Sequence, residues 1–204
     1  MIQQLANTHK LLIETGTFNG VDGTAIFDQN KTRRYFLEKR WSEGENIFTA
    51  VMMNPSNAAH DSSDDTVDQI IEVAKSHHCH ALRVVNVSSI IGGTSSKLTA
   101  AHFAYESLNW SFVSNAMASG QIVFLGWGMK GQKGLNQQNH ISNAFKKVKN
   151  KLYSYDVMRS TDRNYANRPI YYVPHPRPQL DKERYLNEPI RKIDDIGFLQ
   201  LFNE

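Results

Sequence analysis

The chain has 204 residues, a length typical of one domain. Hydrophobic residues make up 40% of it and charged residues 21%, which predicts a sizeable core under an ordinary polar surface. No apolar run approaches the roughly 20 residues of a membrane-spanning helix, and the N-terminus lacks the basic-then-apolar order of a secretory signal. The lack of such a run predicts no membrane association. The single cysteine, Cys79, excludes an intrachain disulfide, which fits a reducing cytosol, so we expect a cytoplasmic protein.

Charge is unevenly distributed along the chain. The net charge is only +3, but residues 120–192 hold fourteen Lys or Arg and five Asp or Glu, a local balance of +9. A segment of this kind favours a polyanionic partner such as DNA, and a solvated helix face around residues 146–151 is the alternative.

Strands and helices are predicted in alternation. In the first 46 residues, "TAIF" and "RYFLEKRW" flank the polar "DQNKT", the pattern of a β-hairpin. Helical spacing of apolar residues, with acids at the start, follows at 62–77 and again, without the acids, at 99–118. The segment "NAFKKVKNKLYSY" is read as a helix, with an extra strand in "KLYSYDVM" as the alternative. The four apolar runs expected to form strands are 47–53, 81–85, 121–126 and 169–173.

This order predicts an α/β fold. We expect a three-layer α/β/α sandwich with a central, mostly parallel four-stranded sheet, plus an N-terminal β-hairpin. The chain is expected to be a single domain with a hairpin extension (1–46), a core (47–180) and a C-terminal helical segment (181–204). Ligands of such sheets bind beyond the carboxyl ends of the strands.

Each apolar run is followed at once by a polar or turn cluster. These clusters are Asn54-Pro55-Ser56, Asn86-Val87-Ser88-Ser89, Trp127-Gly128 and Pro174-His175-Pro176. Four strands would therefore deliver four clusters to one edge of the sheet, where we expect the functional site.

The clusters resemble motifs of the uracil-DNA glycosylase superfamily, in that family's order over roughly residues 47–180. "IVFLGWGMKGQKG" resembles the segment that runs from a strand through Trp-Gly to Gln-Lys-Gly, and "VPHPRPQL" resembles the loop that inserts into the minor groove. "MMNPS" is similar to the motif that activates water, and "VVNVSS" to the strand that ends in a base-reading Asn. The "NPSNA…DDT" stretch also resembles a bacterial and phage family of unassigned function.

The resemblance implies hydrolysis of an N-glycosidic bond on a nucleotide flipped out of duplex DNA. His175 would donate a hydrogen bond to the departing base, and Asn54 would orient the attacking water although its amide cannot take a proton. Asn86 would read the Watson–Crick edge of the base. The plainer alternatives are a loop histidine, a turn after a strand and a strand-end cap.

The pocket departs from the uracil-specific pattern. Ser56 falls where the uracil-specific branch has a Tyr that excludes C5 substituents, and residues 54–86 contain no Phe, Tyr or Trp to stack on the base, so His60 is the candidate for stacking. We therefore expect a C5-modified pyrimidine, such as glucosylated hydroxymethylcytosine of phage DNA, with a role in phage defence.

Contacts with double-stranded DNA are expected from the basic segment and the loop after His175. The candidates are Lys130, Lys133 and Arg177 for phosphates, and Gln179 or Leu180 as the wedge that fills the gap left by the flipped base. Neither a metal, a redox cofactor nor an obligate protein partner is expected. Uracil or mismatch repair, a non-catalytic DNA or nucleobase-binding module, and hydrolysis of free nucleosides remain alternatives.

Overall fold

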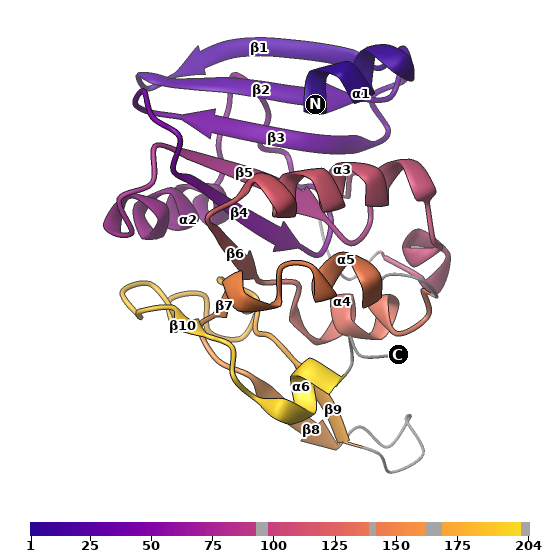
Figure 1. Cartoon of the computed structure of the whole chain (residues 1–204), viewed down its shortest axis with the longest axis vertical. Helices are drawn as coiled ribbons and strands as arrows, with labels where there is room; N and C mark the ends of the chain where they lie inside the picture. Colours follow the sequence, from indigo (N-terminus) through magenta and orange to yellow (C-terminus); the bar gives the residue numbers. More distant parts are fainter. Residues whose placement is uncertain (93–97, 139–141, 162–168, 201–204) are drawn as a thin grey trace.

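The computed structural model describes residues 1–92, 98–138, 142–161 and 169–200. These residues form one eight-stranded sheet covered by helices on both faces, and a small separate two-stranded sheet (Figure 1). The order in the large sheet is β1-β2-β3-β5-β4-β6-β7-β10. Its strands are β1 (Leu12–Phe18), β2 (Val21–Phe27), β3 (Arg34–Arg40), β4 (Ile47–Met52), β5 (Ala81–Asn86), β6 (Ile122–Leu125), β7 (Leu152–Ser154) and β10 (Arg191–Lys192).

The centre of the sheet is parallel, as the alternating sequence pattern predicts. Strand β4 pairs in parallel with both β5 and β6, and β6 pairs in parallel with β7. All six residues of β4 are buried, which explains its continuous apolar run. The α/β class is therefore confirmed.

The expectation of a four-stranded sheet is wrong. The N-terminal hairpin forms as β2 and β3, but β1 joins it, and β3 pairs antiparallel with β5. The first 46 residues thus extend the large sheet by three strands, one more than the predicted hairpin supplies. At the other edge, β10 pairs antiparallel with β7.

The fourth parallel strand is also not the predicted one. The apolar run at 169–173 was expected in the sheet, but β9 (Pro169–Tyr172) pairs with β8 (Met158–Thr161) in the separate ribbon. The fourth position belongs to β7, within the segment read mainly as helix. Strand β7 has only three residues, too few to show the alternating pattern of a strand in the sequence. It is recognised as a strand only through its pairing with β6.

Helices cover the sheet on both sides. One apolar core includes side chains of α1, α3, α4, α5 and α6, and the other includes side chains of α2. The helices are α1 (Ile2–Thr8), α2 (Asp65–Ser76), α3 (Ser107–Ser119), α4 (Gly128–Leu135), α5 (Ser142–Lys146) and α6 (Ile196–Gln200), with short 3₁₀ turns at Ala100–Phe103 and Lys149–Lys151. No helix of the described residues is long and apolar enough to cross a membrane.

The C-terminal segment is mostly not helical. Residues 182–187 form turns, β10 follows, and α6 is a helix of five residues; residues 201–204 lie outside the described part of the chain. Within residues 181–200, the helix expected at 181–204 is therefore limited to α6.

Helix α2 begins where its sequence predicts. Asp64 is the N-cap residue, and its Oδ1 accepts hydrogen bonds from the backbone N–H groups of Thr66 (2.9 Å) and Val67 (3.0 Å). The buried face, with Ile70 and Ile71, packs on the sheet. This start matters because the loop that carries Asn54 ends at the same cap.

Candidate functional site

The turn after β4 lies beside the end of β5. Met52 pairs with Asn86 in the parallel register, and the chain beyond continues this pairing because Val87 N–H donates to the Met52 carbonyl at 2.9 Å and Ser88 N–H to the Met53 carbonyl at 3.0 Å. Two of the predicted strand-end clusters, at 54–56 and 86–89, are therefore neighbours.

The side chain of Asn54 is held by backbone carbonyls. Its Nδ2 donates to the carbonyl oxygens of Pro55 and Gly92, each at 3.0 Å. Both amide hydrogens are thereby used, and no donor among the described residues is bonded to Oδ1. The amide plane is fixed, with its acceptor oxygen available to a water molecule.

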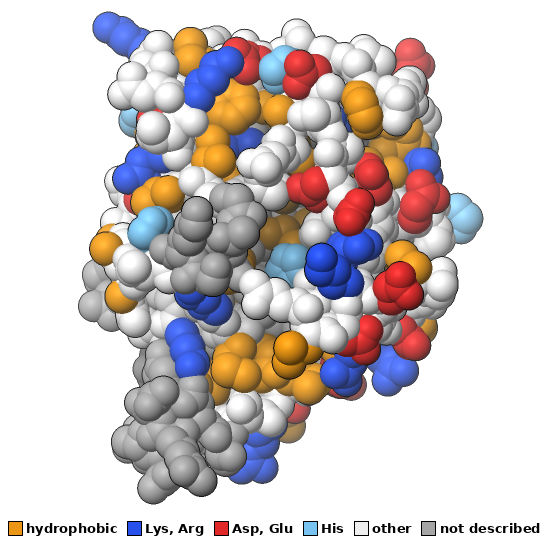
Figure 2. All heavy atoms as spheres, turned by 180° about the vertical axis from the view of Figure 1, so that it is seen from behind, with side chains coloured by type: hydrophobic (Ala, Val, Ile, Leu, Met, Phe, Trp, Pro, Cys, Tyr) orange, Lys and Arg blue, Asp and Glu red, His pale blue; other side chains and the backbone are white. Residues whose placement is uncertain are grey.

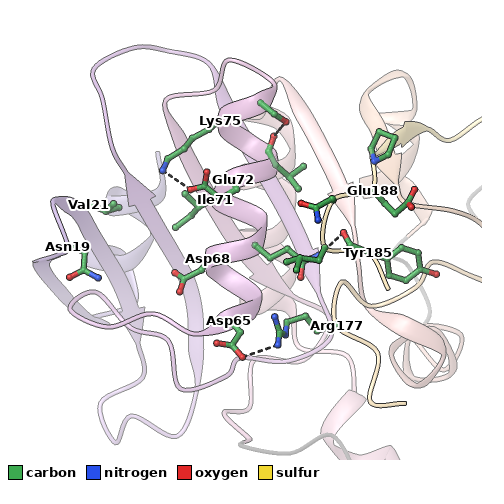
Figure 3. Close-up of a pocket in the computed structure, with 16 residues that line it drawn as sticks. Asn19, Val21, Asp65, Asp68, Ile71, Glu72, Lys75, Arg177, Tyr185 and Glu188 are labelled. Atoms are coloured by element: carbon green, nitrogen blue, oxygen red, sulfur yellow. Dashed lines mark hydrogen bonds and ion pairs between the residues drawn. The ribbon is translucent and has the colours of Figure 1, made fainter. Parts of the chain in front are cut away.

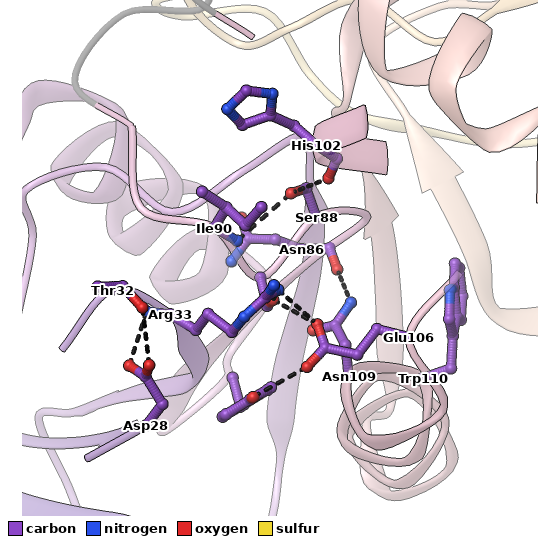
Figure 4. A network of polar contacts seen from close by, with 12 residues as sticks. Asp28, Thr32, Arg33, Asn86, Ser88, Ile90, His102, Glu106, Asn109 and Trp110 are labelled. Carbon is purple, nitrogen blue, oxygen red and sulfur yellow. Dashed lines mark hydrogen bonds and ion pairs between the residues drawn. The ribbon is translucent and has the colours of Figure 1, made fainter. Parts of the chain in front are cut away.

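Asn86 is buried without partners for its side chain. It is 1% exposed, and neither Oδ1 nor Nδ2 has a hydrogen-bond partner in the part of the chain that the structure describes. Its backbone carbonyl, by contrast, accepts from Asn109 Nδ2 at 2.9 Å (Figure 4). Register partners share a face of the sheet, so the Asn86 side chain lies on the same face as that of Met52.

The loop that carries His175 packs against the ends of β4 and β6. A Cβ atom at Gly126 would lie 2.6 Å from Phe124 Cε1, 3.0 Å from Met52 Sδ and 3.1 Å from Pro176 Cδ, and one at Gly128 would lie 3.5 Å from His175 Cβ. Any larger residue at 126 would therefore have to displace the Phe124 ring and crowd the contact between Met52 and Pro176. The loop brings His175 to the face and edge of the sheet that also hold Asn86.

Helix α2 fixes the same loop from the other side. Gln69 is buried, and its Nε2 donates to the carbonyls of Pro176 (3.4 Å) and Tyr185 (3.1 Å) and to the hydroxyl of Tyr155 (3.1 Å). The backbone next to His175 is thus tied to a rigid element, which preorganises the imidazole.

His175 is a half-buried imidazole whose Nδ1 lies against the backbone of Arg177. Nδ1 is 3.1 Å from the Arg177 N–H and 3.0 Å from the Arg177 carbonyl oxygen, and the tautomer that accepts from the N–H carries its proton on Nε2. Burial lowers the pKa of His175, while the hydrogen bond with the Arg177 backbone and the charge of Asp64 oppose that shift. The neutral form of the ring is therefore favoured at neutral pH.

Ser56 has a partner that the sequence analysis did not identify. Its hydroxyl donates a short hydrogen bond to Oδ2 of Asp64, the N-cap of α2. The hydroxyl of Ser56 is therefore already engaged within the protein. The only sequence signal for Asp64 is its position as a helix-start acid, which predicts a cap and not a role at the site.

Two buried cations hold the loop between β4 and α2. Arg34 is 2% exposed and donates through Nη1 to the Ala58 carbonyl, and Lys39, 1% exposed, donates through Nζ to the His60 carbonyl at 3.2 Å. Burial lowers the pKa of Arg34 to about 10, with the charge of Asp64 opposing. Burial likewise lowers the pKa of Lys39. In a strand these cations resemble surface residues, so no sequence signal marked them.

His60 lies away from Asn86. Its carbonyl oxygen occupies the space beside Gly23 of β2, where an added Cβ would be 1.9 Å away. Its ring nitrogens face Glu14 (3.5 Å) and Asp61 (3.6 Å). Strand β3 lies between β2 and β5 in the sheet, so the structure does not bring His60 beside Asn86.

The candidate DNA contacts differ in their surroundings. Arg177 forms an ion pair with Asp65, with 3.1 Å between Nη2 and Oδ2, at one end of a cavity of about 820 Å³ along α2 (Figure 3). Leu180 is fully exposed, as a wedge requires, and its neighbour Gln179 is exposed as well. The other two candidates, Lys130 and Lys133, belong to α4, directly after the strand end of β6.

Charge separates the surface into regions. The described residues of the basic segment (120–138, 142–161 and 169–192) lie mainly in the lower half of the view in Figure 1. The opposite view shows acidic side chains gathered on the α2 side (Figure 2). The charged residues that line the cavity along α2 are the acids Asp65, Asp68, Glu72 and Glu188 and the bases Lys75 and Arg177.

The edge of the sheet thus combines three polar functions on separate elements. His175 offers an imidazole, Asn54 a fixed amide, and Asn86 an unpaired buried amide. Among the described residues, no group of three His, Cys, Asp or Glu side chains lies close enough to hold a metal ion.

Comparison with known proteins adds a family. A search of curated proteins found no match. A family model described as "Protein of unknown function (DUF1643)" matches residues 34–169, which span Asn54, Asp64 and Asn86 but not His175. The match covers more than half of the chain, from the buried Arg34 to the start of β9. The chain belongs to the DUF1643 family.

Proposed function

We propose that this protein is a monofunctional DNA glycosylase that hydrolyses the N-glycosidic bond of a flipped pyrimidine and leaves an abasic site. The observation that carries the proposal is the buried, unpaired amide of Asn86 at the end of β5. An unsatisfied buried polar group costs about 1–3 kcal/mol. A ligand that pairs with both the carbonyl and the NH₂ group would recover this cost, and the edge of a pyrimidine base presents such a pair.

The neighbouring groups match the charges that develop in the reaction. Cleavage leaves negative charge on the base, and Nε2–H of His175 is a preorganised donor for it. The sugar becomes cationic and must be met by water, for which Asn54 Oδ1 is a fixed acceptor.

The base is proposed to be a pyrimidine with a C5 substituent. Support comes from the small side chain of Ser56, at the position where the uracil-specific branch that the chain resembles has a Tyr. Bulky C5 substituents occur in phage genomes, for example as hydroxymethylcytosine and its glucosylated form. Excision of such bases would damage invading DNA and spare an unmodified chromosome, which suggests phage defence.

The proposal is tested with duplex oligonucleotides that each contain one modified pyrimidine. The set includes uracil, hydroxymethylcytosine and glucosylated hydroxymethylcytosine, with the unmodified duplex as control. Abasic sites are detected by strand cleavage in hot alkali, and released bases by mass spectrometry. We expect release of a C5-modified base, and a loss of about 10²–10³ in rate for His175→Ala.

Other outcomes select the alternatives. Efficient release of uracil with no activity on C5-modified bases would indicate a repair glycosylase. Tight binding without release of any base would indicate a non-catalytic module, an alternative favoured by the inability of the Asn54 amide to take a proton. Wild-type rates in folded His175→Ala would remove His175 from the mechanism.

A further inference from the structure

The loop that carries Asn54 ends in a carboxylate whose two oxygens have different surroundings. Asp64 Oδ1 accepts from the backbone N–H groups of Thr66 and Val67, which is all that an N-cap requires. Its Oδ2 accepts the hydroxyl hydrogen of Ser56. The second contact is not needed to begin the helix, so it calls for a separate explanation.

Asp64 is also the charged group shared by the elements around the site. Burial lowers the pKa of the Arg34 guanidinium, from β3, and that of the His175 imidazole, from the loop after β9. The negative charge of Asp64 opposes the shift in both cases. Beside His175, Arg177 is paired with Asp65. Arg34 also holds the loop that leads to Asp64, because its Nη1 donates to the Ala58 carbonyl.

The proposed reaction requires an acceptor for one proton, and Asn54 cannot supply it. A water molecule that attacks C1′ must lose a proton, and an amide has no basic site for it near neutral pH. Ser56 is two residues after Asn54 on the same turn. Its hydrogen is given to Asp64, and its oxygen accepts from the Ala58 backbone N–H at 3.5 Å, which leaves one lone pair for a further donor.

We infer that Asp64 accepts, through the hydroxyl of Ser56, the proton lost by the water that Asn54 positions. This inference rests on the proposed glycosylase function. As the C1′–N bond breaks, its electron pair leaves with the base, which His175 stabilises. The water oxygen bonds to C1′ and gives one proton to Ser56 Oγ, while Ser56 gives its own proton to Asp64 Oδ2. That proton then passes to the released base through solvent, so atoms and charges balance.

The test compares Asp64→Asn with Ser56→Ala and the double variant. Asparagine is as good an N-cap as aspartate, so Asp64→Asn keeps the cap and removes only the basic oxygen. The matched control is Asp68→Asn, because Asp68 accepts from the Ser63 hydroxyl at 2.5 Å in the same part of the chain but is exposed. All variants are first compared with wild type by circular dichroism and thermal unfolding.

We expect each of the two single variants to lose about 10² or more in kcat with little change in KM, the range typical of general-base help. The double variant should lose no more than the larger single loss, because both side chains act on one proton. The control Asp68→Asn should stay within about fivefold of wild type, as for exposed polar pairs.

Two results would overturn the inference while leaving the glycosylase proposal intact. One is an active Asp64→Asn variant with wild-type kcat, and the other is multiplication of the two single losses in the double variant. By contrast, a folded wild-type protein that releases no base from any duplex offered overturns the proposed function itself, and the inference with it.

Discussion

Replacing Asn86 by Leu should stabilise the protein. The two side chains branch alike at Cγ, but Leu has no polar atoms, whereas the Asn86 amide is buried with both polar atoms unpaired. Because an unsatisfied buried group costs about 1–3 kcal/mol, the free energy of unfolding should rise by about that amount. In a chain of this length, each kcal/mol corresponds to a rise of about 2–4 °C in Tm. The same change should abolish base release.

The control is Asn109→Leu, at an equally buried asparagine. Asn109 is 1% exposed and its Oδ1 has no partner among the described residues, but its Nδ2 donates to the carbonyls of Asn86 and Val87. Loss of this donor leaves buried carbonyls unpaired, so Asn109→Leu should lower stability by about 1 kcal/mol. Urea unfolding of wild type and both variants, followed by circular dichroism at 222 nm, shows whether each substitution raises or lowers the free energy of unfolding. If Asn86→Leu destabilises the protein as Asn109→Leu does, the Asn86 amide is not an unpaired group kept for a ligand.

Three further outcomes are expected. Burial holds the pKa of His175 below its ordinary value of 6.5, so the unfolded state takes up the proton before the folded state as pH falls. Wild type should therefore lose stability relative to His175→Gln below about pH 6.5. Equal pH dependence of the two proteins in urea unfolding would contradict this. Gly23→Ala should destabilise the protein by about 1–3 kcal/mol, because the new Cβ would meet the His60 carbonyl at 1.9 Å, and an unchanged Tm would refute that packing. Binding to duplex DNA should weaken steeply as salt rises, and Lys133→Glu should weaken it about equally for all sequences; affinity that does not change between low and physiological salt would exclude a DNA-binding role for the +9 segment.

The sequence determined the features that depend on local patterns. A continuous apolar run predicted the buried strand β4, and an N-cap followed by apolar residues at helical spacing predicted α2. The same runs also showed where strands end, so the sequence alone assigned Asn54 and Asn86 to one edge of the sheet. In a parallel sheet the carboxyl ends of the strands lie on the same side. The end of each strand can be read from its own apolar run, and the shared edge then follows from the type of sheet.

Only the tertiary structure decided which segments pair. Strand β7 has three residues, and the apolar run at 169–173 would fit a central sheet equally well, so the choice of the fourth strand depends on contacts distant in sequence. The same holds for the bond between Ser56 and Asp64, since a carboxylate that caps a helix shows nothing in sequence about its second oxygen. Arg34 carries no local signal for burial, because a cation is buried only where other elements surround it and satisfy its donors.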